Sequence, residues 1–206
     1  ICNISCELCV TKLLCEEMKD NEAIFIIGAR HFHVHSGYLS SSFQFNGSAS
    51  SCTKPNICGW LAIDALRFPD QTAVEQFQDD ISTRRELYKA LIGFNGVVKE
   101  ENATVVASGM WGCGAFNGNP EVKALIQLLA ASEAGVKELR YHTWSDMSLA
   151  NNLTILSNVI KMKEKGFFSV GMLWNIIQTS VEKLSHSKYQ SGELVTMVIN
   201  ELQQMT

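Results

Sequence analysis

A chain of 206 residues with 46% hydrophobic and 18% charged residues is long enough for one packed domain, and it is too apolar to be a disordered tail. The net charge of −4 and the pI near 5.7 argue against a broad electrostatic surface for nucleic acid. No stretch approaches the roughly 18 uninterrupted apolar residues of a membrane helix. We therefore expect no membrane partner and no direct nucleic-acid binding.

The N-terminal stretch is predicted to form a helix from about Ser5 to Met18. Cys2, Cys6 and Cys9 fall on one face of it, and buried small side chains explain this spacing better than a zinc site does. The odd total of seven cysteines favours reduced thiols in the cytoplasm or nucleus. Because the first residue is Ile and not Met, we expect the chain to begin inside a longer protein.

A strand is predicted next, over Ala23 to Gly28, followed by an alternating stretch with His31, His33 and His35. Three histidines on one face of a strand could bind a metal, but no further ligand is recognisable. Exposed side chains are the preferred interpretation, so no metal and no cofactor are expected. Residues 46–58 are rich in Ser and Gly and are predicted to form a flexible loop.

The middle of the chain is predicted to contain a buried strand over Leu61 to Leu66 and one or two helices over Gln71 to Ile92. Acidic residues early in the second segment and basic residues late in it suit helix dipoles and i,i+4 pairs. Arg84 and Arg85 could form a phosphate clamp. A solvated helix face is the preferred interpretation of the two arginines.

Four glycines lie in residues 109–119, between a predicted strand over Ala103 to Ser108 and a predicted helix that starts at Pro120. Glycines let a ligand approach the backbone, and the N-terminus of the helix offers unpaired N–H groups with a partial positive charge. Such a loop suits a diphosphate. It could also be a simple turn, because it carries neither a dinucleotide-binding signature nor a Walker Lys-Ser/Thr pair.

A last strand is predicted over Leu139 to Trp144. Apolar residues then recur at helical spacing around Leu149–Met162, Val170–Leu184 and Glu193–Met205, so residues 149–206 are predicted to form a helical flank. Alternating strands and helices followed by helices predict an α/β domain with a mixed sheet flanked by helices and a C-terminal helical extension.

The chain resembles the poly(ADP-ribose) glycohydrolases in several blocks of uncommon residues that occur in the same order. These blocks are Trp111–Phe116, Lys123–Gln127, Ala62–Phe68 and Arg84–Phe94. The resemblance implies a macrodomain-like fold and ADP-ribose or poly(ADP-ribose) as ligand. It also implies that residues 1–206 are the later portion of one domain, which would be incomplete here. The substrate-binding residues that it implies are Tyr38, Gly112, Cys113, Gly114, Ala115, Phe116, Asn117 and Trp144.

Two departures from the family pattern concern catalysis. The Gly-Gly-Gly…Gln-Glu-Glu segment that carries the family's catalytic carboxylates is absent from this chain, and Glu16-Glu17 falls about ten residues too late to replace it. Met110 stands where the family has an Asn, and a thioether cannot replace an amide in a hydrogen bond. Cys113 is interpreted as a small residue of the loop and not as a nucleophile.

Two functions remain open from the sequence. The first is hydrolysis of ribose–ribose bonds in poly(ADP-ribose), with the Glu pair supplied by a segment of the same protein that precedes Ile1. The second is that of a catalytically inactive relative, which reads ADP-ribose or serves as a structural subunit of a larger assembly. Met110 favours the second function, and the closely matching loop favours ADP-ribose binding of either kind.

Overall fold

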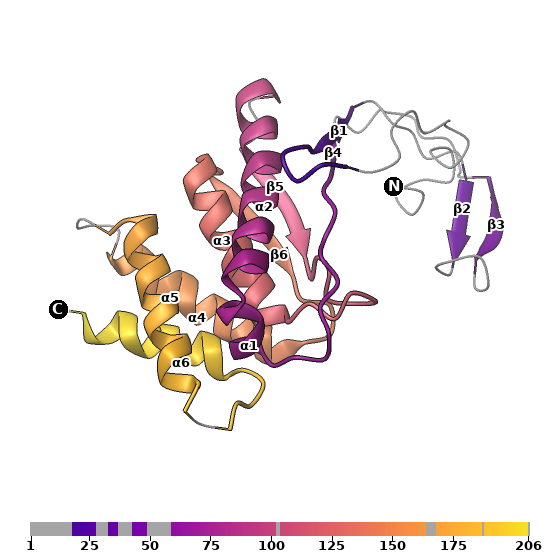
Figure 1. Ribbon diagram of the computed structural model, residues 1–206. Coiled ribbons are helices and arrows are strands. Elements are labelled where there is room, and N and C mark those ends of the chain that lie inside the picture. The colour runs from indigo at the N-terminus through magenta and orange to yellow at the C-terminus, as the bar shows by residue number, and fades with distance from the viewer. Residues whose placement is uncertain are drawn as a thin grey trace.

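The computed structural model describes residues 18–27, 33–36, 43–48, 59–101, 104–163, 168–186 and 188–205 (Figure 1). Its strands are β1 Ile24–Ile26, β2 His33–Ser36, β3 Gln44–Ser48, β4 Trp60–Ala62, β5 Val105–Gly109 and β6 Glu138–His142. Its helices are α1 Ala73–Gln78, α2 Asp80–Glu101, α3 Pro120–Ala134, α4 Met147–Lys163, α5 Val170–Leu184 and α6 Glu193–Gln204.

The described strands pair two by two. β1 pairs with β4 and β2 pairs with β3, both antiparallel, while β5 and β6 are parallel and are connected through α3. Parallel strands need such a crossover, usually a helix, and the β5–α3–β6 segment supplies it. The α/β class predicted from the sequence is therefore confirmed, with both parallel and antiparallel pairs present.

Helix α3 lies at the centre of the packing. Eleven of its 15 residues are buried. Most of these are apolar, such as Leu125 and Ile126, and the buried polar ones, Glu121, Lys123 and Gln127, have partners within the protein. Figure 1 shows α2 and α3 side by side, with α4, α5 and α6 grouped at one end of that pair. Since α3 directly follows the glycine-rich loop, the best-packed helix of the described chain fixes one end of that loop.

The segment predicted as one or two helices over Gln71 to Ile92 forms two, α1 and α2, which are separated at Asp79. Thr72 begins α1 with a capping box: its hydroxyl accepts from the Glu75 amide, and the Glu75 carboxylate accepts from the Thr72 amide. The three helices predicted in the C-terminal part are present as α4, α5 and α6. The bounds of α5 are those predicted, and the bounds of α4 and α6 differ from the predicted ones by one or two residues.

Two strand predictions need correction. The buried strand predicted over Leu61 to Leu66 is β4, which ends at Ala62 and is only half-buried. The strand stops there because the residues after it bond to the glycine-rich loop and to α2 instead of to another strand. The strand predicted over Leu139 to Trp144 ends at His142. Trp144 lies in the turn beyond β6, with a φ of 53°.

Several predictions fall outside the described residues. They include the helix from Ser5 to Met18, residues 49–58 of the predicted loop, Tyr38, and the side chains of His31, His33 and His35. The first residues of that loop are described and belong to β3, which runs to Ser48. Among the described helices, none combines the length and the apolar character that a membrane crossing requires.

Candidate functional site

The glycine-rich loop and Trp144 lie at one edge of the β5–β6 pair. The two parallel strands end in register, since Gly109 pairs with His142. The segments that follow them, residues 110–118 and 143–146, therefore leave the sheet side by side. Ligands of α/β proteins commonly bind at the carboxyl ends of parallel strands, where loops from neighbouring strands meet.

Trp144 presents its side chain to solvent at this edge. It is 85% exposed and has a positive φ, which is unusual for a residue with a bulky side chain. The Trp144 side chain is therefore not part of the hydrophobic core. A strained backbone that exposes an aromatic ring is a feature that clusters at ligand sites.

The loop is held by its own backbone. The amides of Cys113, Asn117 and Gly118 donate to the carbonyls of Met110, Gly114 and Gly112, at 3.1, 3.0 and 2.9 Å. Gly112 and Asn117 have φ values of 75° and 55°. Asn is one of the few residues with a side chain that adopts this region readily, so the loop tolerates Asn117.

The N-terminus of α3 is not free to bind a ligand, contrary to the sequence-based expectation of unpaired N–H groups there. The Asn119 side-chain oxygen accepts from the amides of Glu121 and Val122 at 3.0 and 3.3 Å, and the Asn119 carbonyl accepts from the Lys123 amide. Pro120 has no N–H at all. Asn119 is thus a complete N-cap that uses these donors within the protein.

The unpaired donors lie in the loop itself. Within the part of the chain that the structure describes, the amides of Gly112, Gly114, Ala115 and Phe116 have no acceptor. Backbone amides of successive loop residues can form a concave anion site without any net charge. Four donors within five residues are therefore available to a ligand at the carboxyl edge of the sheet.

Three of the four loop glycines are required by the packing of the protein, and the fourth, Gly114, is not. A Cβ on Gly109, Gly112 or Gly118 would lie within 2.7 to 2.8 Å of another atom of the protein, so the fold itself requires these three. A Cβ on Gly114 would meet nothing within 4 Å, and Gly114 has no positive φ. The internal structure gives no reason for glycine at position 114, and the space over it is open.

Residues 63–68 run along the loop and support it. The Trp111 indole donates to the Ile63 carbonyl at 3.2 Å, and the Phe68 amide donates to the Phe116 carbonyl at 2.8 Å. Both contacts join positions about 48 residues apart. The position of the loop is therefore set by the segment after β4 as well as by β5 and α3.

Gln76 of α1 fixes the end of the loop, a role that the sequence analysis missed. Its amide donates to the Asn117 carbonyl at 2.8 Å, and its side-chain oxygen accepts from the Asn119 amide at 2.7 Å. Gln76 is 1% exposed and lies on the apolar face of α1 with Ala73 and Phe77. A polar residue on an otherwise buried helix face was the signal that could have identified it.

A buried ion pair lies beneath the loop. The Lys123 ammonium pairs with the Glu86 carboxylate, lies 4.2 Å from the centre of the Trp111 ring, and contacts the underside of the loop near Gly112 and Gly118. Both charged side chains are essentially inaccessible to solvent. Burial lowers the pKa of the Lys123 ammonium, and repulsion by the Arg85 guanidinium lowers it further. Lys123 is therefore not a free cation at the loop.

Arg85 and Lys89 extend this cluster. Arg85 is 12% exposed and bonds Asp20 and Glu86 at 2.8 Å each and also Asp64, while Lys89 reaches Asp64 at 2.8 Å. Arg85 is therefore neither a phosphate clamp nor part of a solvated helix face, and both interpretations made from the sequence are wrong for it. Two of its partners, Asp20 and Asp64, lie 65 and 21 residues away along the chain, and helical spacing carries no information about such contacts.

Cys113 and Met110 bring no reactive group to the loop. Burial raises the pKa of the Cys113 thiol to about 12, so the thiol is neutral at physiological pH and unsuited to nucleophilic attack, as its sequence context predicted. Met110 is half-buried and packs against the hydrophobic core. Neither side chain can take part in acid–base chemistry.

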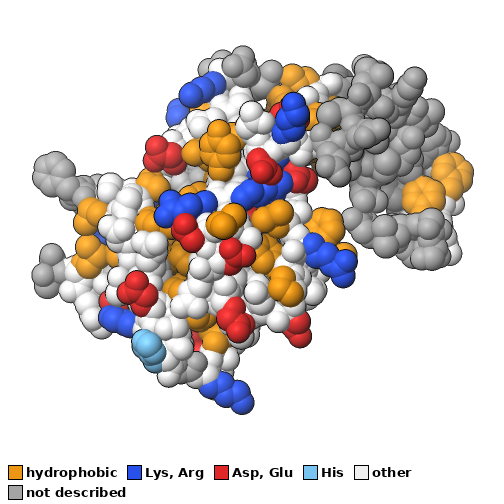
Figure 2. All heavy atoms as spheres, in the orientation of Figure 1, with side chains coloured by type: hydrophobic (Ala, Val, Ile, Leu, Met, Phe, Trp, Pro, Cys, Tyr) orange, Lys and Arg blue, Asp and Glu red, His pale blue; other side chains and the backbone are white. Residues whose placement is uncertain are grey.

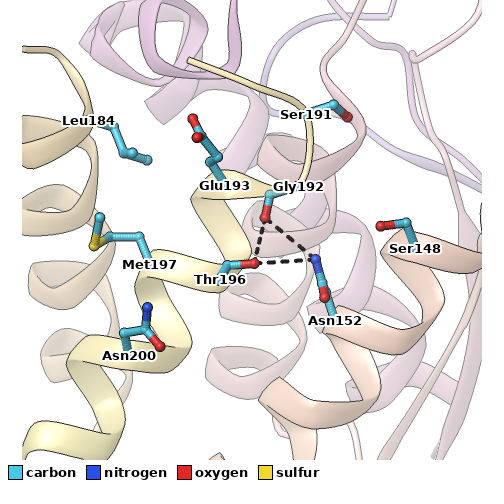
Figure 3. A pocket seen from close by; sticks show the side chains of 9 residues that line it. All are labelled: Ser148, Asn152, Leu184, Ser191, Gly192, Glu193, Thr196, Met197 and Asn200. Atoms are coloured by element: carbon cyan, nitrogen blue, oxygen red, sulfur yellow. Dashed lines mark hydrogen bonds between the residues drawn. The ribbon is translucent and has the colours of Figure 1, made fainter. Parts of the chain in front are cut away.

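Two hollows lie away from the loop. Figure 3 shows a hollow of about 500 Å³ beside α4 and α6, where the Asn152 amide faces the Gly192 carbonyl and the Thr196 hydroxyl. A second hollow of about 330 Å³ lies between β6 and α4 and is lined by Tyr141 and Thr143. Neither is lined by a residue that the sequence analysis assigned to substrate binding.

Charges of both signs are mixed on one face of the molecule. On the face shown in Figure 2, the Lys and Arg side chains alternate with the Asp and Glu side chains. Such a face offers no continuous basic surface to a nucleic acid. A ligand phosphate would therefore have to be recognised locally, by groups at the loop.

Comparison with known proteins gives consistent matches. The sequence model of the family described as "Poly (ADP-ribose) glycohydrolase (PARG), Macro domain fold" matches residues 1–151. Poly(ADP-ribose) glycohydrolase 1 of Caenorhabditis elegans is 32% identical over 84% of this chain and 23% of its own length. Poly(ADP-ribose) glycohydrolase 2 of Caenorhabditis elegans is 30% identical over 94% of this chain and 42% of its own length. The probable poly(ADP-ribose) glycohydrolase 2 of Arabidopsis thaliana is 29% identical over 88% and 41%. The chain thus spans less than half the length of these relatives.

Proposed function

This chain belongs to the poly(ADP-ribose) glycohydrolase family, and on that premise we propose that residues 112–117 hold the diphosphate of an ADP-ribose unit of poly(ADP-ribose). The observation that carries the proposal is the set of four unpaired amides at Gly112, Gly114, Ala115 and Phe116, with open space above Gly114. Unpaired backbone amides of neighbouring loop residues can bind phosphate oxygens without any net charge.

Two exposed aromatic side chains complete the proposed site. Phe116 is 44% and Trp144 is 85% exposed, at the carboxyl edge where β5 and β6 end. An aromatic plane can stack on a base or cover a ribose while the diphosphate occupies the loop. Tyr38 is assigned to the same cleft by the family resemblance alone, since it lies outside the described residues.

The proposed reaction is hydrolysis of the ribose–ribose glycosidic bond. A carboxyl group has to protonate the leaving oxygen or take a proton from water while an oxocarbenium-like sugar forms. No described carboxylate lies unpaired at the loop, and Cys113 is neutral. In this proposal the chain binds and orients the polymer, and the catalytic carboxylates come from the family's Gln-Glu-Glu segment. The glycohydrolase names of the relatives favour this function over that of an inactive reader.

The test is a calorimetric titration with ADP-ribose of the wild-type protein and of the Gly114→Val variant. The added Cβ would meet no protein atom within 4 Å and the side chain would occupy the open space at Gly114, so we expect unchanged stability and at least a tenfold loss of affinity. Gly96→Val is the matched control, because a Cβ there also meets nothing within 4 Å. Equal affinity in all three proteins would reject the assignment of the loop.

A second test addresses turnover. The full-length protein is incubated with poly(ADP-ribose), and free ADP-ribose is measured over time. The proposal expects release by the wild type and little release by Gly114→Val. Tight binding without any release would leave the protein a reader of ADP-ribose and would contradict the proposed hydrolysis.

A further inference from the structure

The proposed diphosphate site lacks a positive charge of its own. The four free loop donors are neutral amides, and the partly positive N-terminus of α3 is occupied by Asn119. The buried Lys123 beneath the loop is paired with Glu86. A bound diphosphate carries negative charge that neutral donors stabilise but do not neutralise, so a nearby cation would add to its affinity.

The other described cations close to this region are engaged. Arg85 and Lys89 are committed to Asp64 and its neighbours in the buried cluster. Arg84 bonds Asp80 at 2.6 Å, and its guanidinium lies 5.7 Å from the centre of the Trp174 ring. None of these three is available to a ligand at the loop without breaking an ion pair.

Arg67 is different. It lies between Ala65 and Phe68 on the segment that runs along the loop. Ala65 packs so closely on Gly112 that a Cβ added at Gly112 would lie 2.7 Å from the Ala65 Cβ. The Phe68 amide donates to the Phe116 carbonyl. Its side chain is exposed. Among the residues that the structure describes, none forms a hydrogen bond or ion pair with the Arg67 guanidinium.

We propose that Arg67 binds a phosphate of the ADP-ribose polymer from the rim of the loop, an inference that rests on the proposed function. Ala65 lies against the loop at Gly112 and Phe68 bonds it at Phe116, so the backbone on both sides of Arg67 is held next to the loop that carries the free amides. The guanidinium is always charged and can bind two phosphate oxygens at once. Arg67 is thus a specificity-determining residue that adds charge to an otherwise neutral cradle.

The experiment measures affinity for ADP-ribose and for a short poly(ADP-ribose) oligomer, each at low and high salt, for wild type, Arg67→Ala and Arg67→Lys. A lost charge-assisted contact lowers affinity roughly tenfold in Arg67→Ala, with partial retention in Arg67→Lys. For the oligomer, the dependence of affinity on salt also becomes shallower in Arg67→Ala, because one fewer phosphate is neutralised.

Arg84→Ala is the control, since it removes the same charge from an exposed side chain that already has partners. We expect it to bind both ligands as the wild type does. Urea unfolding of each variant shows whether the fold is retained, and the unpaired Arg67 predicts no change in the unfolding midpoint for Arg67→Ala.

The pattern of losses identifies the phosphate. Weaker binding of both ligands means that Arg67 contacts the diphosphate held in the loop, and weaker binding of the oligomer alone means that it contacts a neighbouring unit. Both outcomes support the inference. Wild-type affinity of Arg67→Ala for both ligands overturns it and leaves the proposed function standing, whereas a wild-type protein that binds neither ligand overturns both.

Discussion

At the scale of single residues, a few side chains decide what the glycine-rich loop offers to a ligand. Asn119 uses the amides at the start of α3, so the open donors are those of the loop. Gly114 alone among the loop glycines faces open space. The loop therefore works through backbone groups that its neighbours leave unpaired.

Lys123 and Glu86 support the loop from beneath. We expect Lys123→Met to lower the free energy of unfolding by about 3 kcal/mol, because it leaves a buried carboxylate without its ammonium partner. The double variant Lys123→Met with Glu86→Gln removes both charges and keeps an acceptor for the Leu66 amide. It should be more stable than Lys123→Met alone.

Urea unfolding of the wild type, both single variants and the double variant gives the coupling between the two side chains. A strong coupling means that the pair acts as a unit. Additive effects of the two substitutions would show instead that the ion pair contributes nothing beyond its separate side chains.

At the scale of elements, Glu121 joins α3 to the C-terminal helices. Although it lies in the first turn of α3, its carboxylate is 3% exposed and accepts from the amides of Gly192 and Val195 at 2.8 and 2.9 Å. It also accepts from the Tyr189 hydroxyl, whose pKa is raised by burial and by this contact. Gly192, the N-cap of α6, provides no side-chain cap, so Glu121 caps α6 from another helix.

We expect Glu121→Gln to destabilise the protein by about 2 kcal/mol, because an amide offers one oxygen where three donors converge and carries no negative charge. Hydrogen exchange should accelerate in α6 more than in α2, since only α6 loses its cap. Glu193→Gln is the matched control at the same helix terminus. Equal effects of the two variants would mean that the cross-helix cap is unimportant.

At the scale of the whole molecule, one ion cluster holds together segments that are distant in sequence. Asp64 bonds Arg85 and Lys89, and Lys89 also donates to the Lys19 and Glu22 carbonyls. The cluster thus ties the turn before β1 and the segment after β4 to α2. Because that segment also holds the loop through Phe68, the cluster contributes to the geometry of the proposed site.

This cluster predicts a loss of stability in acid. Burial alone would raise the pKa of Asp64, but the hydrogen bonds and charges of Lys89 and Arg85 outweigh it, so the folded-state pKa is lowered. The unfolded chain then binds the proton more tightly than the folded one does. The stabilisation by Asp64 is complete above a pH of about 4 and is lost as the pH falls through the lowered folded-state value.

Urea unfolding between pH 2 and 6 should therefore show a steeper loss of stability in the wild type than in Asp64→Asn, and the difference between the two proteins should shrink at low pH. A difference that stays constant over this range would contradict a role of the Asp64 charge. The other carboxyl groups are the same in both proteins, so their titration cancels in the comparison.

The sequence by itself determined the helices, the β5–α3–β6 unit, the position of the glycine-rich loop and the family. These features are local: helical periodicity, the Pro120 start of α3 and the blocks of uncommon residues are all read within short windows.

Only the tertiary structure decided which groups at the site are free. The pairing of Arg85 and Lys123, the fixing of the loop by Gln76, the exposure of Trp144 and the unpaired state of Arg67 each depend on residues far away in the chain. The sequence around a charged or polar residue does not show whether its side chain is buried with a partner or exposed to solvent. Its availability to a ligand is decided by the segments that pack against it.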